Sequence, residues 1–250
     1  MSRLTGMKPV FRREFKAYFS SPLGYVFIVI FLVASGFLTL SRDFGRLLEL
    51  RQADLTPFFN YIPWLFVILV PAVAMRLWAE ERKTGTVELL LTLPVTLQGA
   101  YLGKFLAGWS FLGLSLFLTW PVVYQAARLG NPDWGAVFGG YLASALTAAA
   151  FLAVGMLFSA LSRNQVVAFI LGVAASALFL LLGLPQTLEF IGKLPGGGYL
   201  EDVFSGLSLI DHFDTLSRGL LEVRSLVFFA LFTLGWLICG MLVLDRTRAA

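Results

Sequence analysis

The chain alternates between long stretches without charged residues and short stretches rich in them. Six stretches of about 18 residues or more contain no Asp, Glu, Lys or Arg, whereas the next longest, 89–103, has only 15 residues. A charge at the centre of a membrane helix costs about 2.5 to 3.5 kcal/mol, so each of the six predicts one transmembrane helix. The six stretches are residues 17–41, 55–75, 105–127, 134–162, 164–188 and 225–244.

The residues before and at the start of the first span carry two further signals. Over residues 7–20, apolar and basic side chains fall on opposite faces at helical spacing, which predicts an amphipathic helix lying in the membrane interface. Its apolar face comprises Val10, Phe11, Phe15, Tyr18 and Phe19, and its basic face comprises Lys8, Arg12, Arg13 and Lys16. Pro22 and Gly24 then predict a break where the chain enters the bilayer.

Two further connections depart from plain polar loops. Arg163 alone separates the fourth and fifth spans, which predicts a tight turn. Between the fifth and sixth spans, residues 189–224 carry apolar residues at intervals of three or four, so they predict two short amphipathic helices, interfacial or re-entrant. Prolines inside the spans predict kinks at Pro63, Pro71 and Pro121.

Composition supports the same class. The 250 residues are 58% hydrophobic and 14% charged, whereas soluble domains average roughly 45 to 50% and 25%. Lys and Arg number 12 on the side of the two termini and 7 on the other, which predicts cytoplasmic termini. The net charge of +4 is therefore explained by membrane orientation rather than by a nucleic-acid partner. The predicted fold is all-α: a polytopic membrane protein with six spans and one transmembrane domain over residues 1–250.

Few residues carry candidate chemistry. The predicted spans contain no ionisable Asp, Glu, Lys, Arg or His, which disfavours a proton-coupled transporter and an intramembrane enzyme. His212, beside Asp211 and Asp214, lacks a fourth ligand and metal-site spacing, so we expect it on an exposed amphipathic helix and expect no metal site. The single cysteine excludes a disulfide framework. No GxxxxGK[ST] phosphate loop is present, so the chain is expected to be non-catalytic.

Residues 80–94, EERKTGTVELLLTLP, form the most informative polar segment. Glu80, Glu81, Arg82 and Lys83 precede a helix-prone run that ends at Pro94. This pattern predicts a short helix below the membrane whose apolar residues Val87, Leu90 and Leu91 are left for a partner. The alternative is an ordinary interfacial helix that follows a charged stop-transfer end.

Three segments of the chain together resemble those of a known family. FRREFKAYFSSPLGYVF, EERKTGTVELLLTLP followed by LGKF, and SLIDHFDTLSRGL before the last span resemble the type 2 ABC exporter permeases, and most closely the permease of the gliding-motility ABC transporter. The resemblance implies that Glu80 to Leu93 is a coupling helix docking on a separate ATPase subunit, with Glu80, Glu81, Gly85, Thr86 and Glu88 as contact residues. It also implies two permeases and two ATPases per complex, with ATP and Mg bound by the ATPase.

The residues expected to serve each contact follow from these patterns and the resemblance. The coupling helix offers Glu80, Glu81, Arg82, Lys83, Gly85, Thr86, Val87, Glu88, Leu90 and Leu91; the interfacial elbow offers Phe11, Arg12, Arg13, Phe15 and Lys16; the outer segment offers His212, Phe213, Arg218 and Gly219.

Two functions remain open at this point. The first is ATP-driven export of a hydrophobic, lipid-like or polymeric cargo across the cytoplasmic membrane, by a homodimer or heterodimer of permeases in contact with membrane lipid. The second is transmission of ATP-driven strain to an envelope or motility partner, with residues 189–224 as the contact.

Overall fold

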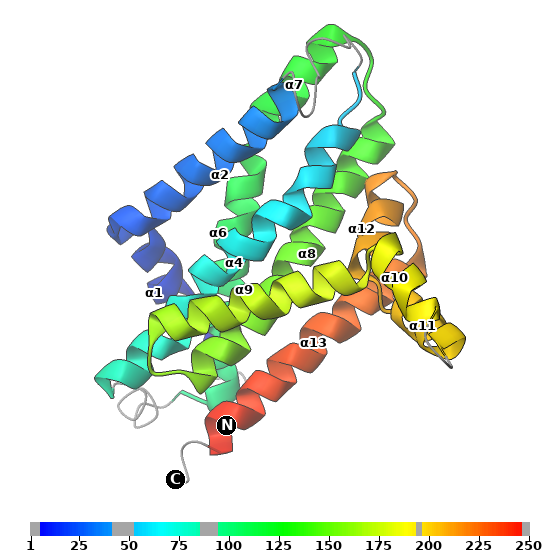
Figure 1. Ribbon diagram of the computed structural model, residues 1–250. Coiled ribbons are helices and arrows are strands. Elements are labelled where there is room, and N and C mark those ends of the chain that lie inside the picture. The colour runs from blue at the N-terminus through cyan, green and yellow to red at the C-terminus, as the bar shows by residue number, and fades with distance from the viewer. Residues whose placement is uncertain (1–5, 42–52, 86–94, 194–196, 247–250) are drawn as a thin grey trace.

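The computed structural model describes residues 6–41, 53–85, 95–193 and 197–246, and all regular structure in these ranges is helical. Six helical segments within them are long and apolar enough to cross a membrane, which confirms the predicted number of spans. Figure 1 shows them as one tilted bundle in which α1 begins and α13 ends at the same end, which we call the terminal end. The spans are α2 (Pro22–Leu40), α4 (Thr56–Thr84), α6 (Leu97–Phe117) continued by α7 (Trp120–Leu129), α8 (Trp134–Leu161), α9 (Gln165–Leu182) and α13 (Val223–Arg246).

Several helices extend beyond the charge-free stretches that predicted them. α4 continues past Arg76 to Thr84, and α6 begins at Leu97 and includes Lys104. The helices therefore include ionisable residues that the predicted spans leave out, and the prediction that these residues lie outside the membrane interior stays a prediction. The physical reason is that a helix continues while its backbone hydrogen bonds are made, and its charges near the membrane boundary need only water or a partner of opposite charge.

The third span is interrupted beside Pro121, where the sequence predicts a kink. α6 stops at Phe117, Leu118 and Thr119 form a turn, and α7 starts at Trp120 with Pro121 in its first turn. Proline fits the first turn of a helix because its missing N–H has no acceptor there in any case. Pro63 and Pro71, in contrast, both lie inside the continuous α4.

The amphipathic helix at the start of the chain is confirmed as α1 (Met7–Ser20), which packs on α6. Ser21 is extended, and Pro22 starts α2, so the chain turns sharply between the two helices. A Cβ at Gly24 would lie 2.0 Å from the carbonyl oxygen of Tyr18. Only glycine therefore permits this close elbow.

α8 occupies the centre of the bundle and packs on α4, α6, α9, α12 and α13. Over its most apolar stretch 78% of residues are buried, compared with 22% for α9 and α13 and 28% for α2. Small residues allow this packing: a Cβ at Gly155 would lie only 2.6 Å from the Cβ of Ala74 on α4. The tight turn predicted around Arg163 is confirmed, and the Asn164 carboxamide oxygen caps α9 by accepting from the N–H of Val166 at 2.9 Å.

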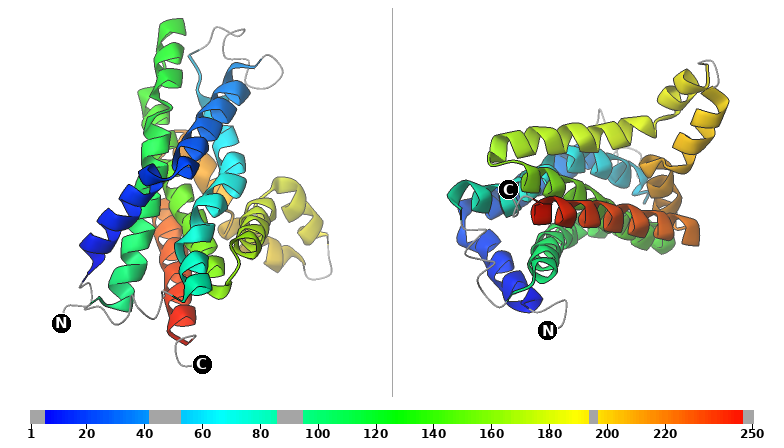
Figure 2. Two further views of the ribbon diagram at one scale, coloured as in Figure 1. Left: turned by 90° about the vertical axis from the view of Figure 1, so that its left-hand side faces the viewer. Right: turned by 90° about the horizontal axis from the view of Figure 1, so that it is seen from below.

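The segment between the fifth and sixth spans contains three short helices instead of two: α10 (Pro185–Gly192), α11 (Gly197–Gly206) and α12 (Leu209–Ser217). α9 ends early because Gly183 and Leu184 leave the helix and Pro185 opens a new one. α10 and α11 pack on each other and project sideways from the bundle (Figures 1 and 2), whereas α12 packs on α8.

Candidate functional site

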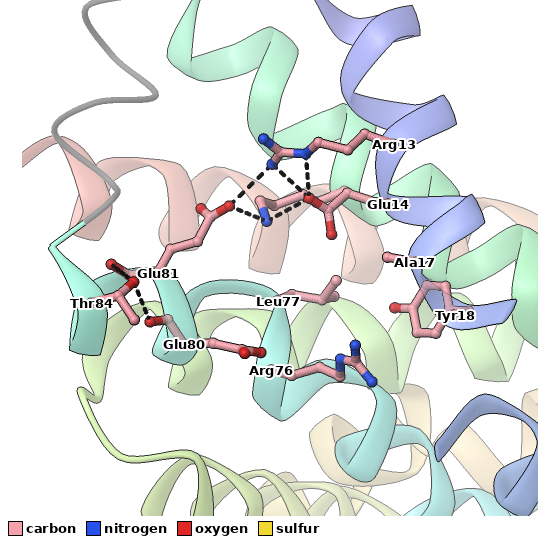
Figure 3. A pocket seen from close by; sticks show the side chains of 10 residues that line it. Arg13, Glu14, Ala17, Tyr18, Arg76, Leu77, Glu80, Glu81 and Thr84 are labelled. Atoms are coloured by element: carbon pink, nitrogen blue, oxygen red, sulfur yellow. Dashed lines mark hydrogen bonds and ion pairs between the residues drawn. The ribbon is translucent and has the colours of Figure 1, made fainter. Parts of the chain in front are cut away.

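Four charged side chains from three helices meet near the terminal end of the bundle. Arg13 and Glu14 come from α1, Glu81 from the last turns of α4, and Lys104 from the first half of α6. We call these four residues the charged cluster, and Figure 3 shows the side chains of Arg13, Glu14 and Glu81 converging on one another.

Each carboxylate in the charged cluster bonds to both cations. Lys104 Nζ donates to Glu81 Oε1 at 2.9 Å and to Glu14 Oε1 at 3.1 Å. Arg13 Nη2 donates to Glu14 Oε1 at 2.7 Å and to Glu81 Oε1 at 3.1 Å. Because positive and negative side chains alternate in the cluster, charge-assisted hydrogen bonds join α1, α4 and α6. Such bonds are about twice as strong as neutral ones.

Lys104 is the buried centre of the charged cluster. Its side chain is 2% exposed, compared with 53% for Arg13. The ammonium also lies 5.0 Å from the centroid of the Trp78 ring, and Trp78 stacks on Tyr101 at 5.4 Å. A buried ammonium is tolerated only when it is paired, so its two carboxylate partners and the indole face are what keep Lys104 in this position.

The charged cluster holds Glu14 in its ionised form. Burial acts to raise the pKa of Glu14, but the nearby Lys104 and Arg13 outweigh it, so the pKa of this carboxyl lies below its ordinary value. For Arg13, burial acts to lower the pKa, but Glu14 and Glu81 outweigh it and the pKa is raised. Both side chains therefore remain charged at neutral pH.

A cavity of about 400 Å³ lies beside the charged cluster and reaches the end of α4. Figure 3 shows that its walls come mainly from α1 and α4. Lys104 of α6 also lines the cavity. Its lining residues are Arg13, Glu14, Ala17, Tyr18, Arg76, Leu77, Glu80, Glu81, Thr84 and Lys104.

The opposite side of the end of α4 is fixed to α8. Ser159 Oγ accepts from the N–H groups of Trp78 and Ala79, both at 3.0 Å, and donates to the carbonyl of Met75 at 2.8 Å. Arg82 donates to the carbonyl of Ala160. The last turns of α4 are thus held by α8 on one side and by α1 and α6 on the other.

The structure revises the start of the predicted coupling helix. Glu80, Glu81, Arg82 and Lys83 belong to α4 rather than to a separate helix, because the backbone stays helical up to Thr84. Gly85 then ends α4 with a left-handed φ of 71°, a conformation that glycine adopts without strain. The remaining predicted contact residues lie outside the described residues: Thr86, Val87, Glu88, Leu90 and Leu91.

Only one of the predicted elbow residues enters the charged cluster. Arg12 and Lys16 are exposed, and Phe11 stacks on Phe15 at 5.8 Å along the half-buried face of α1. Arg13 joins the charged cluster, whereas two other members of the cluster, Glu14 and Lys104, were not among the predicted site residues. Thr96 was a sequence signal that could have indicated the position of Lys104. A threonine is a favoured N-cap residue, and the Thr96 side chain caps α6, so Lys104 lies inside that helix rather than in a loop.

The four residues predicted as contacts in the outer segment differ in their burial. His212 is buried, which corrects its expected place on an exposed helix: its Nδ1 lies 3.0 Å from Ser225 Oγ, and its ring stacks on Phe228 at 4.2 Å. No group of three potential metal ligands occurs among the described residues. Phe213 is buried, Arg218 is exposed, and Gly219 has a φ of 81° where the chain passes close to α8.

A protein-family model matches the chain. Residues 9–244 match the model of the family described as ABC-2 family transporter protein. No curated protein matches the chain. The family match covers nearly all of the chain and does not distinguish the gliding-motility permeases from other members.

Proposed function

The chain belongs to the ABC-2 family of transporter proteins, and from this premise we propose that it exports a hydrophobic, lipid-like or polymeric cargo, driven by motions that enter at the end of α4. As a member of this family it is the multi-pass membrane subunit of an ABC transporter and works with an ABC ATPase subunit. The cargo, the outward direction and the route of coupling are parts of the proposal.

The charged cluster is the observation that carries the proposed coupling route. A push on the last turns of α4 acts on Glu81, which is bonded to Lys104 of α6 and Arg13 of α1. Ser159 and Arg82 make the corresponding bonds with α8. Four helices are therefore expected to move together when a partner ATPase presses on residues 80–94, because rigid elements transmit displacement through such contacts.

Orientation follows from the basic residues. At the terminal end, α1 and the end of α4 carry Lys8, Arg12, Lys16 and Lys83 as exposed cations. Cytoplasmic loops of membrane proteins carry an excess of Lys and Arg. We therefore assign both termini to the cytoplasm and the chain to the cytoplasmic (inner) membrane, where the ATPase binds the ATP and Mg.

The experiment that tests the coupling route is copurification of the tagged full-length chain from its native membranes. Wild type is compared with Glu88→Lys and Gly85→Pro, and with Glu222→Lys, an exposed carboxylate near the opposite end, as the control. The expected result is an ABC ATPase that is retained by wild type and the control but lost, or inactive, with the two variants. Retention of a fully active ATPase by both variants contradicts docking at residues 80–94.

The projecting α10 and α11 favour a second candidate function, transmission of strain to an envelope or motility partner. The Ser208 hydroxyl donates to the carbonyl of Gly183 at 3.2 Å, so the chain leaves and re-enters the bundle at nearly the same point. Replacing residues 185–204 by a short Gly-Ser linker removes the projection and leaves α12 in place. Loss of a copurifying envelope protein, with ATPase activity kept, supports this function; loss of cargo export with no such protein in wild type contradicts it.

A further inference from the structure

A second cavity lies next to the charged one and has an almost entirely apolar wall. It measures about 160 Å³ and runs between α2 and α4, with Phe111 of α6 also in its wall. We call it the elbow groove, since it starts where α1 turns into α2. Both cavities are lined by Tyr18 and Arg76, so these two residues stand where the polar and the apolar spaces join.

Arg76 is a cation at this junction whose guanidinium can still bind an anion. Among the described residues it has no carboxylate within ion-pair distance; its Nη1 lies 3.4 Å from Ser21 Oγ, and its guanidinium lies 5.8 Å from the Tyr18 ring centroid. The other two cations of the charged cavity, Arg13 and Lys104, are already paired with Glu14 and Glu81. A guanidinium keeps its charge and offers several donors, so an anion at Arg76 would be bound strongly.

Tyr18 adds an unused hydrogen-bond donor at the same place. The residue is 4% exposed, and its hydroxyl, which lies beside Gly108 of α6, has no hydrogen-bond partner among the described residues. A buried hydroxyl without a partner costs free energy, so native structures satisfy nearly all such groups. The junction thus combines an unpaired cation with an orphaned donor.

We propose that the elbow groove binds a membrane phospholipid, with its phosphate on Arg76 and the Tyr18 hydroxyl and one acyl chain along the apolar wall. Leu69, which lines the groove, lies two helical turns before Arg76 on α4, so the groove reaches about 10 Å deeper than the guanidinium. Arg76 is also the first charge after the apolar stretch 55–75 and therefore lies near the level of lipid phosphates. A free phosphate would leave the apolar groove unfilled, and this favours the lipid.

The direct test measures lipid binding by native mass spectrometry of the purified full-length chain in detergent, with palmitoyl-oleoyl phosphatidylglycerol as the probe. Diacylglycerol with the same chains lacks the phosphate, and glycerol 3-phosphate lacks the chains. We expect adducts with the phospholipid, few with diacylglycerol, and no displacement by glycerol 3-phosphate. Displacement by glycerol 3-phosphate would overturn the lipid assignment in favour of a plain anion site.

Matched variants locate the binding. Arg76→Gln is expected to weaken phospholipid binding about tenfold, as the loss of a charge-assisted hydrogen bond implies, whereas Arg128→Gln on α7 leaves it unchanged. Val26→Trp fills the elbow groove and should abolish binding, whereas Val29→Trp, at a similarly exposed position on α2 outside the groove, should not. Wild-type binding in both Arg76→Gln and Val26→Trp overturns the proposal.

Tyr18→Phe separates a lipid contact from an internal packing role. If the hydroxyl binds lipid phosphate, the variant binds phospholipid severalfold more weakly and gains less thermal stability from added lipid. If the hydroxyl has no partner even in the membrane, the variant is as stable as wild type or more so, and its lipid binding is unchanged. The second outcome removes Tyr18 from the site. This proposal is independent of the partner ATPase, so it stands or falls separately from the proposed function.

Discussion

At the scale of single residues, Lys104 is the side chain on which the charged cluster depends most. Lys104→Met keeps the apolar stem but removes the ammonium, so Glu14 and Glu81 lose a partner in a site where each is only 16% exposed. Because breaking a buried ion pair leaves uncompensated charge, we expect a loss of about 3 kcal/mol in the free energy of unfolding.

The measurement is denaturant unfolding in detergent micelles. Lys193→Met serves as the control, since Lys193 is 77% exposed and lies 3.9 Å from its partner Glu189. Exposed pairs contribute about 0.2 to 1 kcal/mol, so the control should lose no more than that. Equal losses in the two variants would mean that the charged cluster does not hold the three helices together.

Glu14 gives the charged cluster a defined pH dependence. Its pKa is lower in the folded chain than in the unfolded chain, so the ionised carboxylate stabilises the fold above its ordinary pKa, and the stabilisation is lost as the pH falls through the lowered value. We expect the thermal unfolding temperature of wild type to fall progressively below about pH 5 and that of Glu14→Gln to fall less steeply. Parallel curves for the two proteins would show that Glu14 gains nothing from its partners.

The charged cluster also shows why a sequence pattern identified only part of the site. Glu14 and Lys104 are 90 positions apart, and Arg13 and Glu81 are 68 apart, so helical spacing contains no information about their contact. Arg13 and Glu81 were predicted for other reasons, as a basic face and as part of a charged run. Lys104 looked like a loop residue because charge was taken to mark the end of a helix.

At the scale of elements, the close approach of α12 to α8 depends on glycine. A Cβ at Gly139 of α8 would lie 2.2 Å from the carbonyl oxygen of Leu216 in α12, and backbone atoms cannot yield as a flexible side chain can. Gly139→Ala is therefore expected to cost about 1 to 3 kcal/mol of stability through overpacking. Gly235→Ala on α13 is the control, because nothing lies within 4 Å of its added Cβ, and alanine favours the helix by up to about 1 kcal/mol. Similar unfolding temperatures for the two variants would contradict the close contact.

The number of membrane spans was predictable, and the ends of the helices were not. Charge-free length reflects the cost of burying charge at the bilayer centre, so it located all six spans. That cost falls towards the membrane boundary, and α4 accordingly runs on to Thr84. The short helices between the fifth and sixth spans were miscounted because Pro185, inside an apolar stretch, ends one helix and begins another.

At the scale of the whole molecule, burial falls from the centre to the perimeter. α8 forms the interior, α4 is about half buried, and α2, α9 and α13 present rows of exposed apolar side chains along their lengths. Lipid can cover such faces, but a transport path between two subunits needs a second copy on one of them. We propose that in a dimer the second and fifth spans, α4 and α9, lie at that boundary, since rigid-body motion of one bundle against the other can open a space between them.

Cysteine cross-linking in native membranes tests this arrangement, and the chain suits it because Cys239, its single cysteine, can be replaced by Ser. Ile68→Cys on α4 and Ile170→Cys on α9 introduce thiols at positions that are 55% and 58% exposed in the single chain. Val33→Cys on α2, at a position 64% exposed, is the matched control. We expect a disulfide-linked dimer on oxidation when Ile68→Cys and Ile170→Cys are combined, and none from Val33→Cys. A dimer from Val33→Cys alone would place the partner on α2 and leave α9 to the lipid, and then the cargo path would have to lie elsewhere than between α4 and α9.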